Sequence, residues 1–139
     1  MTAPRRVAFG PNGDGFILAL LFDESLSSHR EFRVELRHTD LSFTASTADG
    51  RNALKHFSAE LSAVSQTLSG RASLETEDFS LNILAQPLGH LRFEGELRAY
   101  QFAQYPTGCM AVRFQQMFDP ITIADSIVQL QDVIGLLKP

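Results

Sequence analysis

The side chains best suited to chemistry in this sequence are two groups of closely spaced carboxylates: Glu75, Glu77, Asp78, Glu94 and Glu96. Paired carboxylates can act as general acid and general base, as they do in glycoside hydrolysis. Alternate carboxylates on an exposed strand face more often form ion pairs across neighbouring strands, and Arg92 and Arg98 flank the second group. We therefore interpret these five residues as candidate partner-binding residues and assign no catalytic residue.

The histidines and the cysteine form no motif for a metal or a nucleophile. The four histidines are His29, His38, His56 and His90. They form no His-x-x-x-His pair, and Cys109 is the single cysteine, so an internal disulfide is excluded. There is no G-x-S-x-G elbow. The glycines at positions 10, 13 and 15 precede an apolar strand, whereas those of a dinucleotide-binding loop follow one. We expect no metal and no cofactor.

The charges of the chain do not form a nucleic-acid footprint. The 139 residues include 12 Lys and Arg against 16 Asp and Glu, which gives a formal net charge of −4. The arginines at positions 30, 33 and 37 are interspersed with Glu31 and Glu35, whereas nucleic-acid binding requires clustered positive charge. We expect no nucleic-acid partner. A modest acidic excess favours solubility or attraction to a basic protein.

The longest apolar run, residues 15–22, has the length of a strand. A membrane-spanning helix needs about 20 apolar residues, so we expect no membrane association. The run also lacks the context of a secretory signal, because Asp14, Asp23 and Glu24 flank it and no small-x-small cleavage site follows. We interpret it as a buried strand of a cytoplasmic protein.

Two segments show the three- and four-residue periodicity of an amphipathic helix. The apolar stripe of the first is Leu54, Phe57, Leu61, Val64 and Leu68. The second begins at Asp119 and Pro120, because an aspartate can accept the free amides of the first turn and proline suits the first helical position. Its apolar stripe is Ile123, Ile127, Leu130, Ile134 and Leu137. We predict one helix inserted among strands and one C-terminal helix.

Most of the remaining segments alternate apolar and polar residues, which is typical of half-buried strands. The predicted strands lie within residues 15–22, 30–37, 41–46, 72–75, 79–83, 91–97 and 110–114. Short turns favour antiparallel pairing. We predict an α+β fold with a mostly antiparallel sheet of about six or seven strands. Residues 1–14, with their prolines and glycines, are predicted to be a flexible N-terminal tail, and residues 15–139 a single domain without an internal repeat.

Three stretches, taken in order, resemble a known group of proteins. They are residues 54–75, residues 88–91, and residues 118–130. The order F-x-x-x-L, L-x-G-x-A-x-L, G-H-[IVL] and a phenylalanine–aspartate helix start resembles the WapI-like immunity proteins and related uncharacterised bacterial families. The resemblance covers roughly residues 30–137. The family pattern usually continues from the aspartate with a polar residue, whereas Pro120 follows here, and no functional residue is carried over.

The resemblance implies a small bacterial protein that binds and neutralises a cognate toxin domain, often a nuclease, inside the producing cell. We therefore expect a non-enzymatic binding protein, an immunity-type inhibitor. A first alternative is a small-molecule-binding module or enzyme with a pocket between sheet and helix, on which His38, His90 or Cys109 would converge. A second alternative is a homo-oligomer that pairs exposed strand edges.

Overall fold

The computed structural model describes residues 5–9, 16–22, 31–38, 41–48, 51–76, 78–100 and 109–136, which form two antiparallel sheets and two helices. Sheet A consists, in spatial order, of β1 (Arg5–Phe9), β2 (Phe16–Phe22), β3 (Glu31–His38) and β4 (Leu41–Ala48). Sheet B consists of β5 (Arg71–Glu75), β6 (Phe79–Ala85), β7 (Leu91–Tyr100) and β8 (Cys109–Phe118). The predicted α+β class is confirmed, but the strands form two sheets of four and not one sheet of six or seven.

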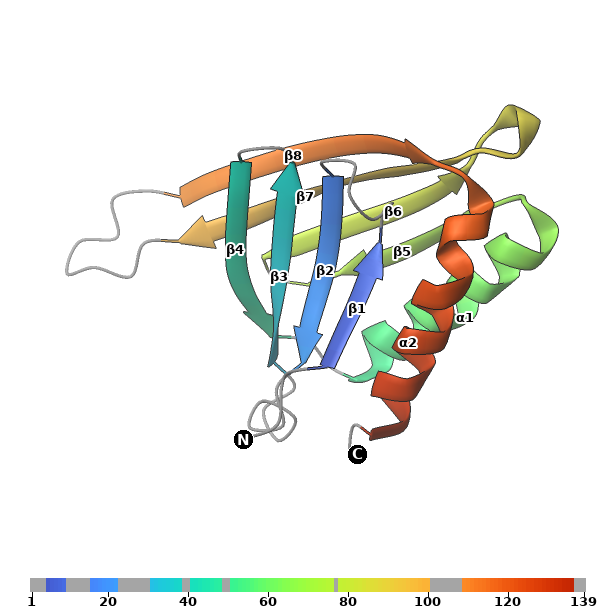
Figure 1. Ribbon diagram of the computed structural model, residues 1–139. Coiled ribbons are helices and arrows are strands. Elements are labelled where there is room, and N and C mark those ends of the chain that lie inside the picture. Colours follow the sequence, from blue (N-terminus) through green and yellow to red (C-terminus); the bar gives the residue numbers. More distant parts are fainter. Residues whose placement is uncertain are drawn as a thin grey trace.

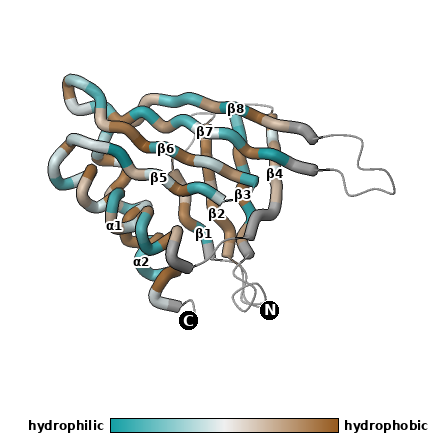
Figure 2. Tube along the Cα trace, turned by 180° about the vertical axis from the view of Figure 1, so that it is seen from behind, coloured by the Kyte–Doolittle hydropathy of each residue, from teal (hydrophilic) through white to brown (hydrophobic). Residues whose placement is uncertain are grey.

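The two sheets face each other, and the strands of one run across those of the other (Figure 1). Alternation along each strand creates this arrangement, because every second side chain points to the same face. Figure 2 shows hydrophilic and hydrophobic residues alternating along β6 and β7. The inner faces meet through aromatic rings: the centroids of Phe9 and Phe93 are 5.7 Å apart, as are those of Phe16 and Phe118.

Helix α1 (Arg51–Thr67) joins the two sheets in sequence and packs against β5. Its predicted stripe is buried at Leu54, Phe57, Leu61 and Val64. The fifth predicted position, Leu68, is exposed because the helix has already ended there: its φ is +52°, in the left-handed region. The stripe was therefore predicted correctly except for its last residue.

Helix α2 (Ile123–Leu136) packs against both α1 and β1. The 3-10 turn η3 (Pro120–Thr122) leads into it, and the side chain of Asp119 accepts a hydrogen bond of 3.1 Å from the backbone N–H of Ile121. The predicted start signal at Asp119 and Pro120 is confirmed. Among the described residues, neither helix has the length and apolar character needed to cross a membrane.

The fold repeats itself, which the sequence did not reveal. Four antiparallel strands followed by a helix occur twice, as β1–β4 with α1 and as β5–β8 with α2. The buried helical residues correspond at a constant offset of 69 positions: Leu54 with Ile123, Leu61 with Leu130, and Val64 with Val133. The prediction of no internal repeat is wrong at the level of topology. These three pairs are buried in both helices, but most other corresponding residues of the two helices are different amino acids. A search for identical residues therefore does not detect the repeat.

The predicted N-terminal tail also needs correction. Residues Arg5–Phe9 form β1, which pairs with β2 in antiparallel register, and the side chains of Val7 and Phe9 are buried. Only two apolar residues alternate in this five-residue strand, and prolines and glycines surround it, so the alternation is too short to stand out. The rest of the predicted tail lies outside the described residues.

Candidate functional site

The candidate site is the outer face of sheet B, where polar side chains from all four strands stand in two adjacent rows. The strand register places Glu75, Ser80, Glu96 and Arg113 in one row. It places Ser73, Asn82, Glu94 and Gln115 in the next. Successive side chains of a strand point to opposite faces, and the alternate residues of sheet B pack into the core. The residues of these two rows therefore lie on the outer face.

Glu96 is held between two arginines. Its carboxylate accepts a hydrogen bond of 2.9 Å from the Nε of Arg113 on β8, and it lies 3.4 Å from the Nε of Arg98 on its own strand. Glu94 lies 3.3 Å from the Nε of Arg92. Exposed ion pairs of this kind contribute about 0–1 kcal/mol each, so they bring opposite charges together but add little to stability. The predicted pairs of these carboxylates with Arg92 and Arg98 do form, but within β7; the pair across neighbouring strands is made by Arg113, which was not predicted.

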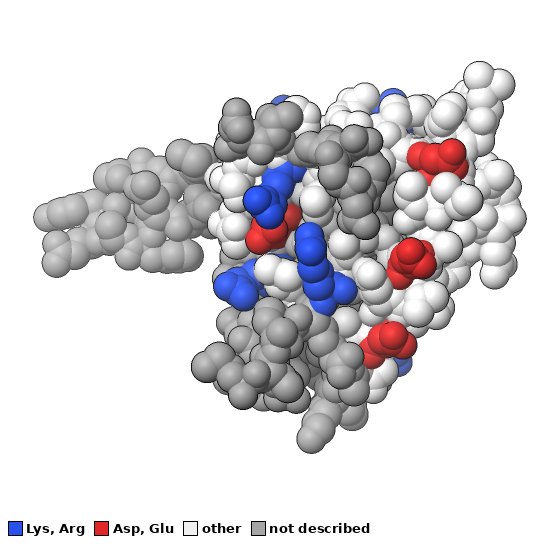
Figure 3. Space-filling model, in the orientation of Figure 1, with Lys and Arg blue, Asp and Glu red and all other residues white. Residues whose placement is uncertain are grey.

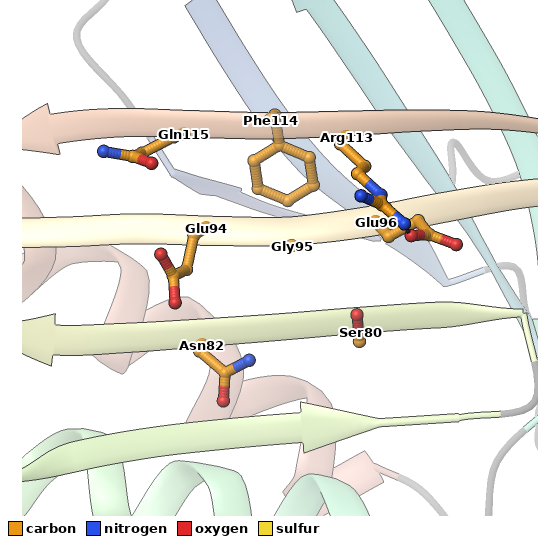
Figure 4. A pocket seen from close by; sticks show the side chains of 8 residues that line it. All are labelled: Ser80, Asn82, Glu94, Gly95, Glu96, Arg113, Phe114 and Gln115. Atoms are coloured by element: carbon orange, nitrogen blue, oxygen red, sulfur yellow. Dashed lines mark hydrogen bonds and ion pairs between the residues drawn. The ribbon is translucent and has the colours of Figure 1, made fainter.

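An open groove of about 460 Å³ lies within this face (Figure 4). It is lined by Ser80, Asn82, Glu94, Gly95, Glu96, Arg113, Phe114 and Gln115. The groove follows β6, whose short side chains stand beside the longer ones of β7. The hydroxyl of Ser73 donates a 2.6 Å hydrogen bond to the amide oxygen of Asn82, and Figure 4 shows the amide nitrogen turned along the strand toward Ser80. The groove therefore offers both donors and acceptors.

Gly95 lets the strands and the ring of Phe114 come together behind this groove. A Cβ on Gly95 would lie 2.0 Å from the carbonyl oxygen of Ser80 and 2.8 Å from Cζ of Phe114. Phe114 faces inward, with its ring centroid 6.0 Å from that of Phe16 on sheet A. The residue under the groove is thus a glycine for steric reasons.

The structure brings together three of the five predicted contact residues. Glu75, Glu94 and Glu96 share the outer face, and β6 separates Glu75 from Glu96. Asp78 lies in the β5–β6 turn, where its backbone carbonyl accepts a 2.8 Å hydrogen bond from the N–H of Arg98. Glu77 lies outside the described residues.

The face is mixed in charge and not an acidic patch. Its outward positions include Arg71, Arg92, Arg98 and Arg113 as well as the three glutamates. Arg113, Asn82 and Gln115 were missed by sequence reasoning, although the alternation of polar residues with Val112 and Phe114 carried a signal. What was missing was the register, which decides that Arg113 stands beside Glu96.

The alternative site with converging histidines and cysteine is not formed. His90 lies just before β7, at the end where Leu91 pairs with Phe118, whereas Cys109 pairs with Tyr100 at the other end of the same ladder. Ten residues of extended strand separate these ends by roughly 30 Å. His38 belongs to sheet A, 6.4 Å from the ring of Phe16. The groove described above lies on the outer face of sheet B, and its lining residues come from β6, β7 and β8 and not from a helix. No group of three or more His, Cys, Asp or Glu side chains within the described ranges could hold a metal ion.

A second charged feature lies on the outer face of sheet A (Figure 3). Arg6 and Arg33 both pair with Leu21, from opposite sides, so they stand in one row across three strands. Arg37 lies further along β3, 4.0 Å from Glu35. The interspersed glutamates were expected to prevent a basic face. Period-two spacing puts Arg33, Glu35 and Arg37 on the same face, so the arginines stand there with Glu35 between them. In the same view, acidic side chains gather over α2.

Comparisons with models of known protein families, with curated proteins and with solved structures found no match to this chain.

Proposed function

We propose that this chain is a non-catalytic protein-binding domain and that the outer face of sheet B is its contact surface. The observation that carries the proposal is the clamped carboxylate of Glu96, held by Arg98 and Arg113 on a face built from four paired strands. Side chains that are already paired in the free protein lose less freedom on binding than unpaired ones. A broad face with a shallow groove suits a protein surface better than a small ligand, which usually occupies an enclosed pocket.

The proposed partner is a bacterial toxin domain, and the chain would act as an immunity-type inhibitor in the cytoplasm of the producing cell. The order of motifs along residues 30–137 supports this class. The net charge of −4 supports a basic partner such as a nuclease, because complementary charge speeds the encounter of two proteins. Inhibition would follow from steric occlusion, which needs no reacting group on this chain.

The first experiment asks whether a partner exists. A gene for a toxin-like C-terminal domain would first be sought beside the gene for this chain, and that domain would be expressed in a bacterial host with and without the chain. Restored growth, together with a complex of the two purified proteins, is the expected result. A toxin domain that kills equally well in the presence of the chain, and does not bind it, would rule out the immunity proposal.

The second experiment locates the surface. In the double variant Glu94→Gln/Glu96→Gln, three arginines lose their counter-charges, so the positive charge of the face increases and a basic partner is repelled more strongly. We expect association at low salt to slow by about tenfold or more, and the difference to shrink at high salt. Stopped-flow or biolayer measurements of the association rate provide the readout.

The matched control is Asp125→Asn/Asp132→Asn, which removes two exposed carboxylates from α2 and changes the net charge equally. This control should slow association much less. Equal slowing by both double variants would mean that net charge matters and that the outer face of sheet B is not the contact surface.

A further inference from the structure

Two of the four sheet edges are covered by the helices through matched hydrogen bonds. On β1, the N–H of Ala8 donates to Oε1 of Gln129 at 2.9 Å, and the hydroxyl of Ser126 donates to the carbonyl oxygen of Ala8. On β5, the N–H of Ser73 donates to Oε1 of Glu60 at 3.2 Å. Glu60 and Gln129 occupy corresponding positions in the two halves of the fold. Each helix thus occupies backbone groups that would otherwise invite another strand.

Strand β8 is the opposite edge of sheet B, and no described residue lies alongside its free side. Figure 1 and Figure 2, seen from opposite directions, both show it as the outermost strand. It spans ten residues and contains no proline, and its one charged side chain is Arg113. Short length, proline and several charges are the usual protections of an exposed edge, and β8 has almost none of them.

The inner face of β8 is also incompletely covered. On the neighbouring strand β7, the inward side chains of Phe93 and Leu97 are fully buried. The inward side chains of Val112, Phe114 and Gln116 on β8 are only partly buried. A further strand added beside β8 would cover this partly exposed apolar margin as well as satisfy the free backbone groups.

We propose that β8 pairs in antiparallel fashion with β8 of a second copy of the chain, so that two copies of sheet B form one continuous eight-stranded sheet. A two-fold axis makes such an interface self-complementary: if one residue of the first copy faces a second residue of the other copy, the second residue of the first copy also faces the first residue of the other. This proposal does not depend on the identity of a toxin or on the contact surface proposed above.

The side chains of β8 select one register. Centring the axis on Phe114 places Arg113 opposite Gln115 of the second copy and the two Phe114 rings against each other, over a ladder of nine residues. Centring it on Arg113 would oppose two like charges, which is unfavourable. Centring it on Gln115 shortens the ladder to seven residues. The register centred on Phe114 gives the longest pairing without opposed charges.

The test uses charge at Gln115. We expect the purified chain to have twice its 15.4 kDa mass by size-exclusion chromatography with light scattering. Gln115→Arg places two arginine pairs across the axis and should weaken dimerisation by about tenfold at low salt, whereas Gln115→Glu forms two ion pairs with Arg113 and should strengthen it several-fold. Both shifts should diminish at high salt.

The matched controls are Gln131→Arg and Gln131→Glu, the same chemical changes at an exposed position of α2. They should leave the dimer unchanged, and circular dichroism would establish that all four variants are folded. A chain that stays monomeric up to its solubility limit would overturn the proposal. So would a dimer that responds equally to changes at Gln115 and Gln131, since that dimer would use another surface.

Discussion

At the scale of single residues, Gly95 controls how closely the strands approach at the candidate site. A Cβ there would lie 2.0 Å from a backbone oxygen that cannot move without displacing β6. Gly95→Ala should therefore destabilise the protein by about 3 kcal/mol or more. Thermal or urea denaturation would measure the change. The control is Gly135→Ala in α2, where nothing lies within 4 Å of the added Cβ and about 0.5–1 kcal/mol of stabilisation is expected.

A destabilisation of Gly95→Ala no larger than that of an ordinary surface substitution would mean that the strands separate easily at this point. The groove would then be a deformable feature and a weak basis for a binding site. The result therefore bears on function as well as on stability.

The residue scale also shows what could be predicted from the sequence about the site. The alternation of Glu94 and Glu96 with apolar residues placed both on an outer face beside Arg92 and Arg98, and this was confirmed. Arg113 could not be assigned to them, because residues 17 positions apart become neighbours only through the register of β7 and β8. Local pattern determines which face a residue occupies, and long-range pairing determines its neighbours.

At the scale of elements, the 3-10 turn η2 (Pro87–Gly89) between β6 and β7 contains an unusual leucine. Leu88 has a φ of +70° and is 95% exposed. Left-handed backbone costs a non-glycine residue about 1–2 kcal/mol, and an exposed side chain recovers little of this through packing. Leu88→Gly should stabilise the protein by roughly 0.5–1 kcal/mol after the larger unfolded-state entropy of glycine is subtracted. Chemical denaturation would measure this.

The control for this prediction is Leu41→Gly, at an exposed leucine on β4 that does not have a positive φ. At Leu41 there is no left-handed backbone strain for glycine to remove, and glycine weakens a strand. A decrease of about 0.5–1 kcal/mol in the free energy of unfolding is therefore expected. Destabilisation by Leu88→Gly would show instead that the leucine side chain makes a stabilising contact.

Long periodic elements were predicted well because many residues report the same period. Both helices have four or five apolar positions on one stripe, and Pro120 with Asp119 marks a start. The missed element was β1, and the missed arrangement was the division into two sheets. Alternation indicates that a strand has one buried face. The same alternation is seen whether a helix or a second sheet covers that face, so it does not predict how the strands are divided between sheets.

At the scale of the whole molecule, the two halves of the fold are fastened to each other by their helices. Ser126→Ala/Gln129→Ala would leave the N–H and carbonyl of Ala8 without their α2 partners. Losing the partners of these partly buried backbone groups costs up to about 1–3 kcal/mol each, and we expect the double variant to lose about 2–4 kcal/mol. Hydrogen exchange should accelerate first in β1, with Gln131→Ala as the control on the exposed face of α2.

If β1 stays protected from exchange while the whole protein loses stability, the two side chains act through the packing of α2 and not as a cover for the edge. An increase in aggregation of the double variant, without a matching increase in the control, would be further support for the role of the helix in blocking strand addition.

Strand β1 and the helix α2 that covers its edge are far apart in the chain, so they leave the ribosome at different times. The two hydrogen-bond partners of Ala8 lie 118 and 121 positions later in the chain. A ribosome adding about 5–20 residues per second needs roughly 6–24 s to make that stretch. For all of this time the edge of β1 has no helix to cover it. Slower translation lengthens this interval, so the yield of soluble protein should depend on the speed at which the second half is made.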